Sequence, residues 1–232
     1  MEKTLKIMLS AFIMLLVHAS LPSTISSADN PPDFFYVYLK WPGSQCATKE
    51  GCCLTKTPKP ARDFIITGFQ PYYFNGTWPE NCDPASHLDV SKISHLRTRL
   101  EVHWPSLTCP GSNPEKLWSD AWKKYGTCSK PTLKNQQEYF RQALAVRKSA
   151  NLLKILGDAG IRPDGSSYPR DTISDTIIGG GLHLPGLGCS TDKDGNSQLD
   201  QVILCTGSDA KTFTECPGNG FGCDGDVKFP HF

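Results

Sequence analysis

Net charge is almost absent from this chain. Its 232 residues include 24 basic and 23 acidic side chains, and without the first few residues, which hold Glu2, Lys3 and Lys6, each sign counts 22. Proteins that bind polyanions regardless of sequence rely on a basic excess, because nucleic acids are held through their phosphates. The balance argues against general polyanion binding and leaves room only for a local basic patch.

Long apolar runs are absent after the N-terminal segment. Three charged residues precede an apolar run at 7–17, which is shorter than the ~20 residues that cross a membrane, and small residues follow at 26–28. This layout is typical of a secretory signal peptide. We expect residues 1–28 to be cleaved and residues 29–232, roughly 204 residues, to form a single extracellular or vacuolar domain.

Metal-binding and phosphate-binding motifs are also missing. No Cys-x-x-Cys occurs, no histidine stands at ligand spacing from a cysteine, and the glycine run at 179–181 lacks the Lys-Ser/Thr of a phosphate loop. The ten cysteines behind a signal peptide indicate five disulfides made in an oxidising compartment. We therefore expect a monomer with no metal, no cofactor and no membrane partner.

Strand and helix patterns follow one another without regular alternation. Aromatic and β-branched residues predict strands at 33–41, 64–69, 201–206 and 227–230. Apolar spacing predicts helices at 89–104, at 117–125 with Ser119 as N-cap, at 136–156 as two consecutive helices, and at 172–178. The segments at 42–60 and 72–86 are expected to be loops. This mixture favours an α+β fold over a doubly wound sheet.

Two short segments are the most specific features of the chain. Residues 64–71 read Phe-Ile-Ile-Thr-Gly-Phe-Gln-Pro, and residues 118–128 read Trp-Ser-Asp-Ala-Trp-Lys-Lys-Tyr-Gly-Thr-Cys. Both resemble the signature segments of the ribonuclease T2 family in its plant S-like branch, F-x-I-H-G-L-W-P and W-x-H-E-W-x-K-H-G-T-C. The resemblance implies an α+β ribonuclease T2-like fold, with a central, mostly antiparallel sheet flanked by helices.

The structural frame of that family recurs from about residue 33 to residue 232. The resemblance, and not the cysteine spacing, implies the disulfide pairs Cys46–Cys52, Cys53–Cys109, Cys82–Cys128, Cys189–Cys223 and Cys205–Cys216.

The catalytic positions that the resemblance implies carry other residues here. RNA cleavage needs a base for the 2′-hydroxyl and an acid for the leaving oxygen, and histidine suits both because its pKa lies near neutrality. The family histidine of the first segment falls on Thr67. In the second segment, two histidines fall on Asp120 and Tyr125, the glutamate falls on Ala121, and the lysine is kept as Lys124. We therefore expect loss of acid–base catalysis, with Asp120 repelling RNA.

Positions that contact substrate in the family differ as well. The tryptophan of the first segment is Gln70, the glutamine common before Trp41 in plant members is Lys40, and a phenylalanine of the second segment is Leu117. Stacking on aromatic side chains is a main source of affinity for single-stranded RNA. We expect RNA binding, if present, to be weak.

The other histidines offer no replacement. His18 falls in the expected signal, and the rest stand outside both segments, at positions 87, 95, 103, 183 and 231. We interpret them as surface or internally satisfied side chains, because a general base must reach hydrogen-bond distance of its substrate.

One N-glycosylation sequon stands in the loop expected at 72–86. Asn75 is its acceptor, and both the glycosylated and the unmodified loop stay open as alternatives. The aromatic residues around it, Tyr72, Tyr73, Phe74 and Trp78, form either core or a binding surface, and we favour core.

Three hypotheses about function follow. The first is a secreted or vacuolar ribonuclease T2-like protein without RNA-cleaving activity, a pseudoenzyme that serves as a storage or stress and defence protein. The second is a weak endoribonuclease that acts through a 2′,3′-cyclic phosphate with Lys124 and water. The third is a module that binds RNA or another ligand without cleaving it. We favour the first, because the scaffold is intact while the site is not.

Overall fold

A seven-stranded sheet forms the centre of the molecule. The structure is a computed structural model that describes residues 30–55, 58–109, 113–218 and 222–232, so the expected signal segment lies outside the described residues. The sheet has the order β2-β1-β5-β7-β3, with β4 and β6 also paired to β5. Its strands are β1 (Phe34–Lys40), β2 (Ile65–Tyr72), β3 (Ser167–Pro169), β4 (Gly186–Thr191), β5 (Ser197–Gly207), β6 (Phe213–Thr214) and β7 (Asp226–Lys228).

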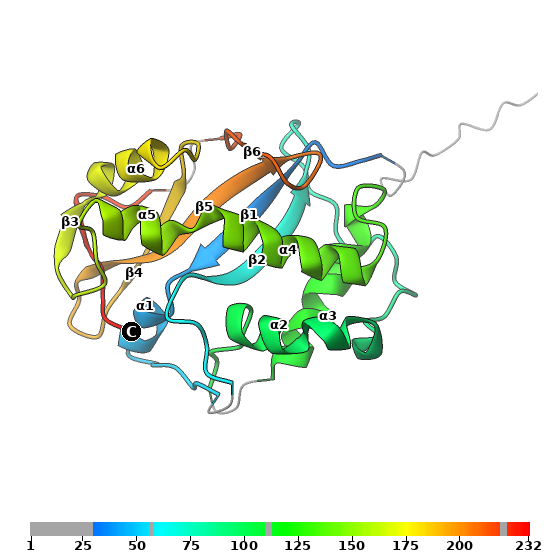
Figure 1. The fold of residues 1–232 in the computed structure, drawn as a ribbon, viewed down its shortest axis with the longest axis horizontal. Helices are drawn as coiled ribbons and strands as arrows, with labels where there is room; N and C mark the ends of the chain where they lie inside the picture. The colour runs from blue at the N-terminus through cyan, green and yellow to red at the C-terminus, as the bar shows by residue number, and fades with distance from the viewer. Residues whose placement is uncertain (1–29, 56–57, 110–112, 219–221) are drawn as a thin grey trace, which may run out of the picture.

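Helices cover one face of this sheet (Figure 1). They are α1 (Pro42–Ala47), α2 (Arg97–His103), α3 (Pro114–Lys124), α4 (Gln136–Ala150), α5 (Leu152–Asp158) and α6 (Arg170–Gly179), with 3₁₀ segments η1 (Val90–Leu96) and η2 (Gly126–Ser129). All strand pairs are antiparallel except β5 with β7. The expected α+β fold with a mostly antiparallel sheet is confirmed.

Alternation along β1 divides its side chains between the two faces of the sheet. Phe35, Val37 and Leu39 belong to the main core cluster beneath the helices. Phe34 and Tyr36 belong to a smaller cluster with Ile203 and Cys205 of β5. The strand is therefore buried on both faces and lies inside the sheet, between β2 and β5.

The long helical segment is broken in two at Asn151, as the sequence predicts. Asn151 caps both α4 and α5 with a left-handed backbone, φ 44° and ψ 38°. Asparagine tolerates this region better than most residues because its short polar side chain bonds locally. The break lets the apolar side of each helix face the same core, including Tyr139 and Phe140 of α4 and Leu156 of α5.

Several expected boundaries are wrong. The helix expected from residue 117 begins at Pro114, because the side chain of Asn113 caps it by accepting the N–H of Lys116 at 3.0 Å. Ser119 lies inside that helix and is not its cap. The segment at 89–104 is a 3₁₀ stretch followed by a short α-helix, and α1 lies within an expected loop. Strands β3, β4 and β6 were not expected, because their sequences carry weak strand signals.

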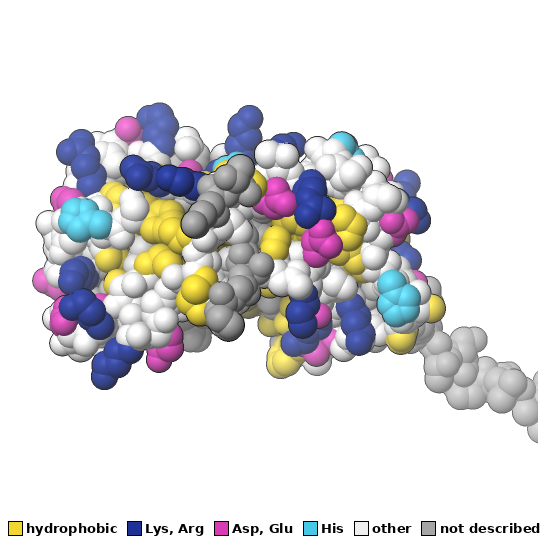
Figure 2. Space-filling view, turned by 90° about the horizontal axis from the view of Figure 1, so that it is seen from below, with side chains coloured by type: hydrophobic (Ala, Val, Ile, Leu, Met, Phe, Trp, Pro, Cys, Tyr) yellow, Lys and Arg dark blue, Asp and Glu magenta, His cyan; other side chains and the backbone are white. Residues whose placement is uncertain are grey.

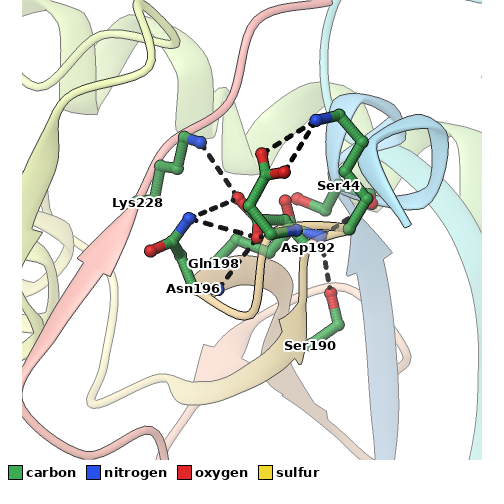
Figure 3. Close-up of polar contacts among 8 residues, drawn as sticks. Ser44, Ser190, Asp192, Asn196, Gln198 and Lys228 are labelled. Carbon is green, nitrogen blue, oxygen red and sulfur yellow. Dashed lines mark hydrogen bonds and ion pairs between the residues drawn. The ribbon is translucent and has the colours of Figure 1, made fainter. Parts of the chain in front are cut away.

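A buried carboxylate organises the turn between β4 and β5. Asp192 accepts bonds from the backbone N–H groups of Asp194 (2.9 Å) and Asn196 (2.8 Å), and from Nζ of Lys228 on β7 (3.0 Å). These bonds, with those from the Asn196 side chain, hold its pKa well below the usual range. Figure 3 shows the side chain directed at Asn196 and Lys228.

Buried Gln198 extends this network to α1. Its Nε2 donates to the carbonyl of Ser44 at 2.8 Å and to Oγ of Ser190 at 3.1 Å, while Ser44 Oγ donates to the carbonyl of Leu199 (Figure 3). The turn, α1 and β7 are thereby tied into one polar assembly.

Five disulfides close loops around the sheet. They join Cys46–Cys52, Cys53–Cys109, Cys82–Cys128, Cys189–Cys223 and Cys205–Cys216, the pairs that the resemblance implied. No helix among the described residues is long and apolar enough to cross a membrane.

Candidate functional site

A β-bulge presents Thr67. Ile66 and Gly68 pair with successive residues of β1, so Thr67 between them is the extra residue, and such bulges redirect side chains. Its hydroxyl accepts a bond from Nε2 of Gln201 on β5 at 2.8 Å and donates to the carbonyl of Tyr38 at 3.4 Å. Because β1 lies between β2 and β5, the Gln201 side chain reaches across β1 and engages the position where the family carries a histidine.

Two buried tryptophans hold α3 against the core. Trp118 Nε1 donates to the carbonyl of Trp104 at 2.9 Å, and Trp122 Nε1 donates to the carbonyl of Ser86 at 3.1 Å. Gly126 follows the helix where any Cβ would collide with the Trp122 ring. These frame residues fix the direction of the helix face that carries residues 120, 121 and 124.

That face carries Asp120 and Ala121 at the positions where the resemblance places a histidine and the glutamate. Asp120 Oδ2 pairs with Nζ of Lys116 at 2.6 Å, and both side chains are well exposed. Ala121 and Leu117 are partly buried and pack against the core. Asp120 thus remains a solvated carboxylate, and its pairing with Lys116 offsets part of the repulsion expected toward an anion.

Lys124 is held by a carboxylate and a phenol ring. Its Nζ lies 3.0 Å from Oε1 of Glu80 and 5.0 Å from the centroid of the Tyr125 ring. Hydrogen bonding to Tyr125, and then to Glu80, raises the pKa of Lys124 above its usual value. Glu80 also accepts the indole N–H of Trp78 at 3.0 Å. Lys124 therefore stays protonated near neutrality, so it offers positive charge but cannot act as a base.

Tyrosines fill the space beside Lys124. Burial, followed by interactions with Tyr72, raises the pKa of Tyr38 far above its usual value, and burial also raises the pKa of Tyr72. Neutral phenols hold their protons at physiological pH. Gln70 lies close to these tyrosines. The position of a Cβ on Gly68 would be 2.9 Å from the Tyr38 ring and 3.0 Å from Nε2 of Gln70, so both side chains pack over Gly68.

Lys40 does not present a free charge. Its Nζ lies 3.0 Å from Oδ2 of Asp200, and both side chains are largely buried. Asp200 is itself the extra residue of a bulge between β4 and β5, and it also accepts a bond from Ser190 Oγ at 3.4 Å. The charge of Lys40 is thus neutralised within the sheet.

The aromatic residues near the sequon are not all core, contrary to the expectation favoured above. Phe74 is 70% exposed and Trp78 52% exposed, because the turn at 73–77 projects beyond the end of β2. Phe74 stacks on Phe34 with centroids 5.6 Å apart, and Trp78 leans on Tyr72 at 5.7 Å. Each ring is covered on the side of its aromatic neighbour, and much of its surface stays exposed.

Asn75 is exposed on this turn. Its Oδ1 accepts bonds from the backbone N–H and the hydroxyl of Thr77, at 2.9 Å and 2.7 Å. Whether the sequon carries a glycan stays a prediction.

The histidines have their contacts elsewhere. Nδ1 of His183 lies 3.5 Å from Oε1 of Glu215, His231 lies against Gly165, and His103 lies beside Arg147. His87 and His95 make no side-chain hydrogen bond or ion pair with any described residue. No described histidine is in contact with Thr67 or Lys124.

Sequence reasoning missed three residues of this site: Glu80, Asp200 and Gln201. Gln201 lies 134 positions from Thr67, and Glu80 stands in a loop without strand or helix periodicity. No local pattern marks them, since their importance lies only in what they contact.

Taken together, the frame, the five disulfides and the arrangement of the two segments define a ribonuclease T2 fold. The family model described as "Ribonuclease T2 family" matches residues 32–216, and the chain belongs to this family. It is 41% identical to "Ribonuclease 1" of Arabidopsis thaliana over 98% of this chain and 100% of the relative. It is 30% identical to "Ribonuclease-like storage protein" of Panax ginseng, over 87% of this chain and 82% of the relative.

A solved structure agrees with this membership. The crystal structure of RNase NT in complex with 5′-AMP superposes with a TM-score of 0.81 at 42% identity, covering 88% of this chain and 100% of that chain. The resemblance to the ribonuclease T2 family is thereby confirmed, and the nucleotide is a property of that relative.

Proposed function

We propose that this protein is a non-cleaving member of the ribonuclease T2 family, a secreted or vacuolar storage or stress and defence protein. One observation carries the proposal. The positions of acid, base and glutamate hold Thr67, Asp120, Ala121 and Tyr125, and the only catalytic-type residue left, Lys124, is bound to Glu80 and fully protonated. A group that holds its proton throughout cannot both remove one and return one.

The hydrogen bonds and ion pairs of the substituted residues support the proposal further. Thr67 is bonded to Gln201 and Asp120 is paired with Lys116, so both side chains already have a partner within the protein. Figure 2 shows one face of the molecule, on which basic and acidic side chains are interspersed and hydrophobic ones are exposed between them.

The storage role rests on two supports. The Panax ginseng relative is named as a ribonuclease-like storage protein, and five disulfides with a buried aromatic core favour persistence against proteolysis. Protein abundance through a cycle of dormancy and regrowth tests it. Bulk accumulation that falls during regrowth supports storage, whereas induction from a low level under wounding or starvation supports the stress role.

Single-turnover cleavage of RNA, with enzyme in excess, tests the loss of catalysis. Because acid and base each contribute about 10²- to 10⁴-fold, we expect a rate at least ~10³-fold below that of an active relative. A matched variant restores the family residues: Thr67→His, Asp120→His, Ala121→Glu and Tyr125→His. We expect it to gain activity, measured as 2′,3′-cyclic phosphate product. Cleavage by the native chain at the rate of an active relative would sink the proposal.

The weak-ribonuclease alternative has its own control. Any residual activity that depends on the charge of Lys124 must disappear in Lys124→Ala and persist in Lys123→Ala, since Lys123 is the neighbouring exposed lysine on α3. Activity unaffected by both substitutions comes from a contaminating nuclease.

A further inference from the structure

A basic pocket lies between α2 and α4, and no residue of either signature segment belongs to its lining. Its volume is about 410 Å³, and its lining consists of Arg99, His103, Leu144, Arg147 and Lys148. Leu144 is the only apolar member. In a chain whose acidic and basic residues are balanced, four nitrogen-bearing side chains around one small pocket are a local concentration of positive charge.

The cations of this α2–α4 pocket differ in their partners. Arg147 is compensated, because its Nη2 lies 2.6 Å from Oδ2 of Asp63 and its Nε donates to the carbonyl of Phe64 at 2.8 Å. Arg99 and Lys148 are exposed and make no ion pair or side-chain hydrogen bond with any described residue. The positive charges of Arg99 and Lys148 are therefore neutralised by no carboxylate among the described residues and face solvent.

His103, which also lines the pocket, has an unsatisfied ring nitrogen. Its Nδ1 is completely buried and has no hydrogen-bond partner among the described residues, although leaving a buried polar atom unpaired costs about 1–3 kcal/mol. Burial, and then the positive charge of Arg147 and Arg99, lowers the pKa of His103 to about 4, against an opposing contribution from Asp63. The ring is therefore neutral at pH 7, chiefly because it is buried and then because Arg147 lies beside it.

We propose that the α2–α4 pocket binds a small phosphomonoester, of the size and polarity of a sugar phosphate. The phosphate dianion matches the two uncompensated cations, and charge-assisted bonds to Arg and Lys are the strongest that such a group makes. A volume of about 410 Å³ exceeds what a bare phosphate needs and falls within the range of small-molecule sites. The Arg and Lys side chains of the lining carry hydrogen-bond donors, which suit the hydroxyl groups of a sugar.

Ring signals of His103 in NMR spectra provide the test on the native chain. Ribose 5-phosphate, inorganic phosphate, ribose and sodium chloride are titrated separately at pH 7 and matched ionic strength. We expect ribose 5-phosphate to shift the His103 signals with saturation, inorganic phosphate to do so at least about threefold more weakly, and ribose and chloride to have no effect. A bound anion must also raise the pKa of His103 above about 4. The signals of exposed His95 on η1 are the internal control.

A charge-removing variant completes the test. Arg99→Ser with Lys148→Ser is expected to weaken ribose 5-phosphate binding tenfold or more, since about 1.4 kcal/mol corresponds to tenfold, and Lys154→Ser, an exposed lysine on α5, is expected to leave it unchanged. A His103 signal that does not move, or that chloride moves equally, overturns the proposal. Equal affinity for inorganic phosphate and ribose 5-phosphate overturns the phosphomonoester assignment. These titrations contain no RNA, so a negative result would reject phosphomonoester binding in this pocket without bearing on the proposed loss of RNA cleavage.

Discussion

At the scale of single residues, the substituted positions have acquired partners. Thr67 accepts a hydrogen bond from Gln201, Asp120 pairs with Lys116, and Lys124 is held by Glu80 and Tyr125. None of these partners is a histidine. Restoring a single histidine at Thr67 would therefore leave the acid missing, which is why the four-substitution variant is the informative one.

Asn151 offers a conformational test at this scale. Its left-handed backbone, φ 44°, costs an ordinary L-residue about 1–2 kcal/mol. We expect Asn151→Ala to lower the free energy of unfolding by about 1 kcal/mol and Asn151→Gly to leave it nearly unchanged, measured by equilibrium denaturation. Equal effects of alanine and glycine would show that the side-chain contacts of Asn151, and not its backbone, matter.

At the scale of elements, the hairpin of β4 and β5 depends on Asp192. Strand β4 has few strand-forming residues, so its pairing relies on a turn whose N–H groups bond to one buried carboxylate. A carboxyl whose pKa is lower in the folded state than in the unfolded chain stabilises the fold above the unfolded pKa. That contribution is lost as pH falls through the folded pKa.

Asp192→Asn is expected to remove this pH dependence. The variant should melt at a clearly lower temperature than the native chain at pH 6, because the ion pair with Lys228 is lost. The difference in melting temperature between the native chain and the variant should narrow as pH falls below about 3.8, the ordinary pKa of an aspartate carboxyl. Thermal unfolding followed by circular dichroism from pH 6 to pH 2 measures it, with Asp194→Asn, an exposed residue paired with Lys193, as control. A constant difference at every pH would contradict the role assigned to the charge.

At the scale of the whole molecule, the disulfides limit how far the chain can open. The bridges close loops of very different length, from 6 residues for Cys46–Cys52 to 56 for Cys53–Cys109. Because the entropy removed from the unfolded chain grows with the logarithm of loop length, the long bridge should stabilise by about 4 kcal/mol and the short one by about 2 kcal/mol.

Two double variants test this difference. Cys53→Ala with Cys109→Ala should lower the free energy of unfolding about twice as much as Cys46→Ala with Cys52→Ala, measured in guanidinium chloride. The pair is well matched, since Cys52 and Cys53 are adjacent in the chain. An equal loss from both would indicate that native-state packing around the sulfurs outweighs loop closure.

Much of the fold was predictable because the signals are local. Aromatic and β-branched residues mark β1 and β2, and the segment at 136–156 was predicted to form two consecutive helices, although the position of the break was not. The start of α3 at Pro114, the helix α1 and the strand β4 were not predictable. Their sequences favour loops, and only Asn113, the network of Gln198 with Ser44, and pairing with β5 stabilise them.

The sequence by itself determined that Thr67, Asp120, Ala121 and Tyr125 carry no imidazole, and neither a threonine hydroxyl nor an alanine methyl titrates near neutrality as histidine does. It also determined the number of cysteines available for bridges. Only the tertiary structure decided that Gln201 engages Thr67, that Glu80 engages Lys124, and that Arg99 and Lys148 lie around a buried, unpartnered nitrogen of His103. These contacts join distant segments, and their energies depend on distance and burial, which no local pattern of residues contains.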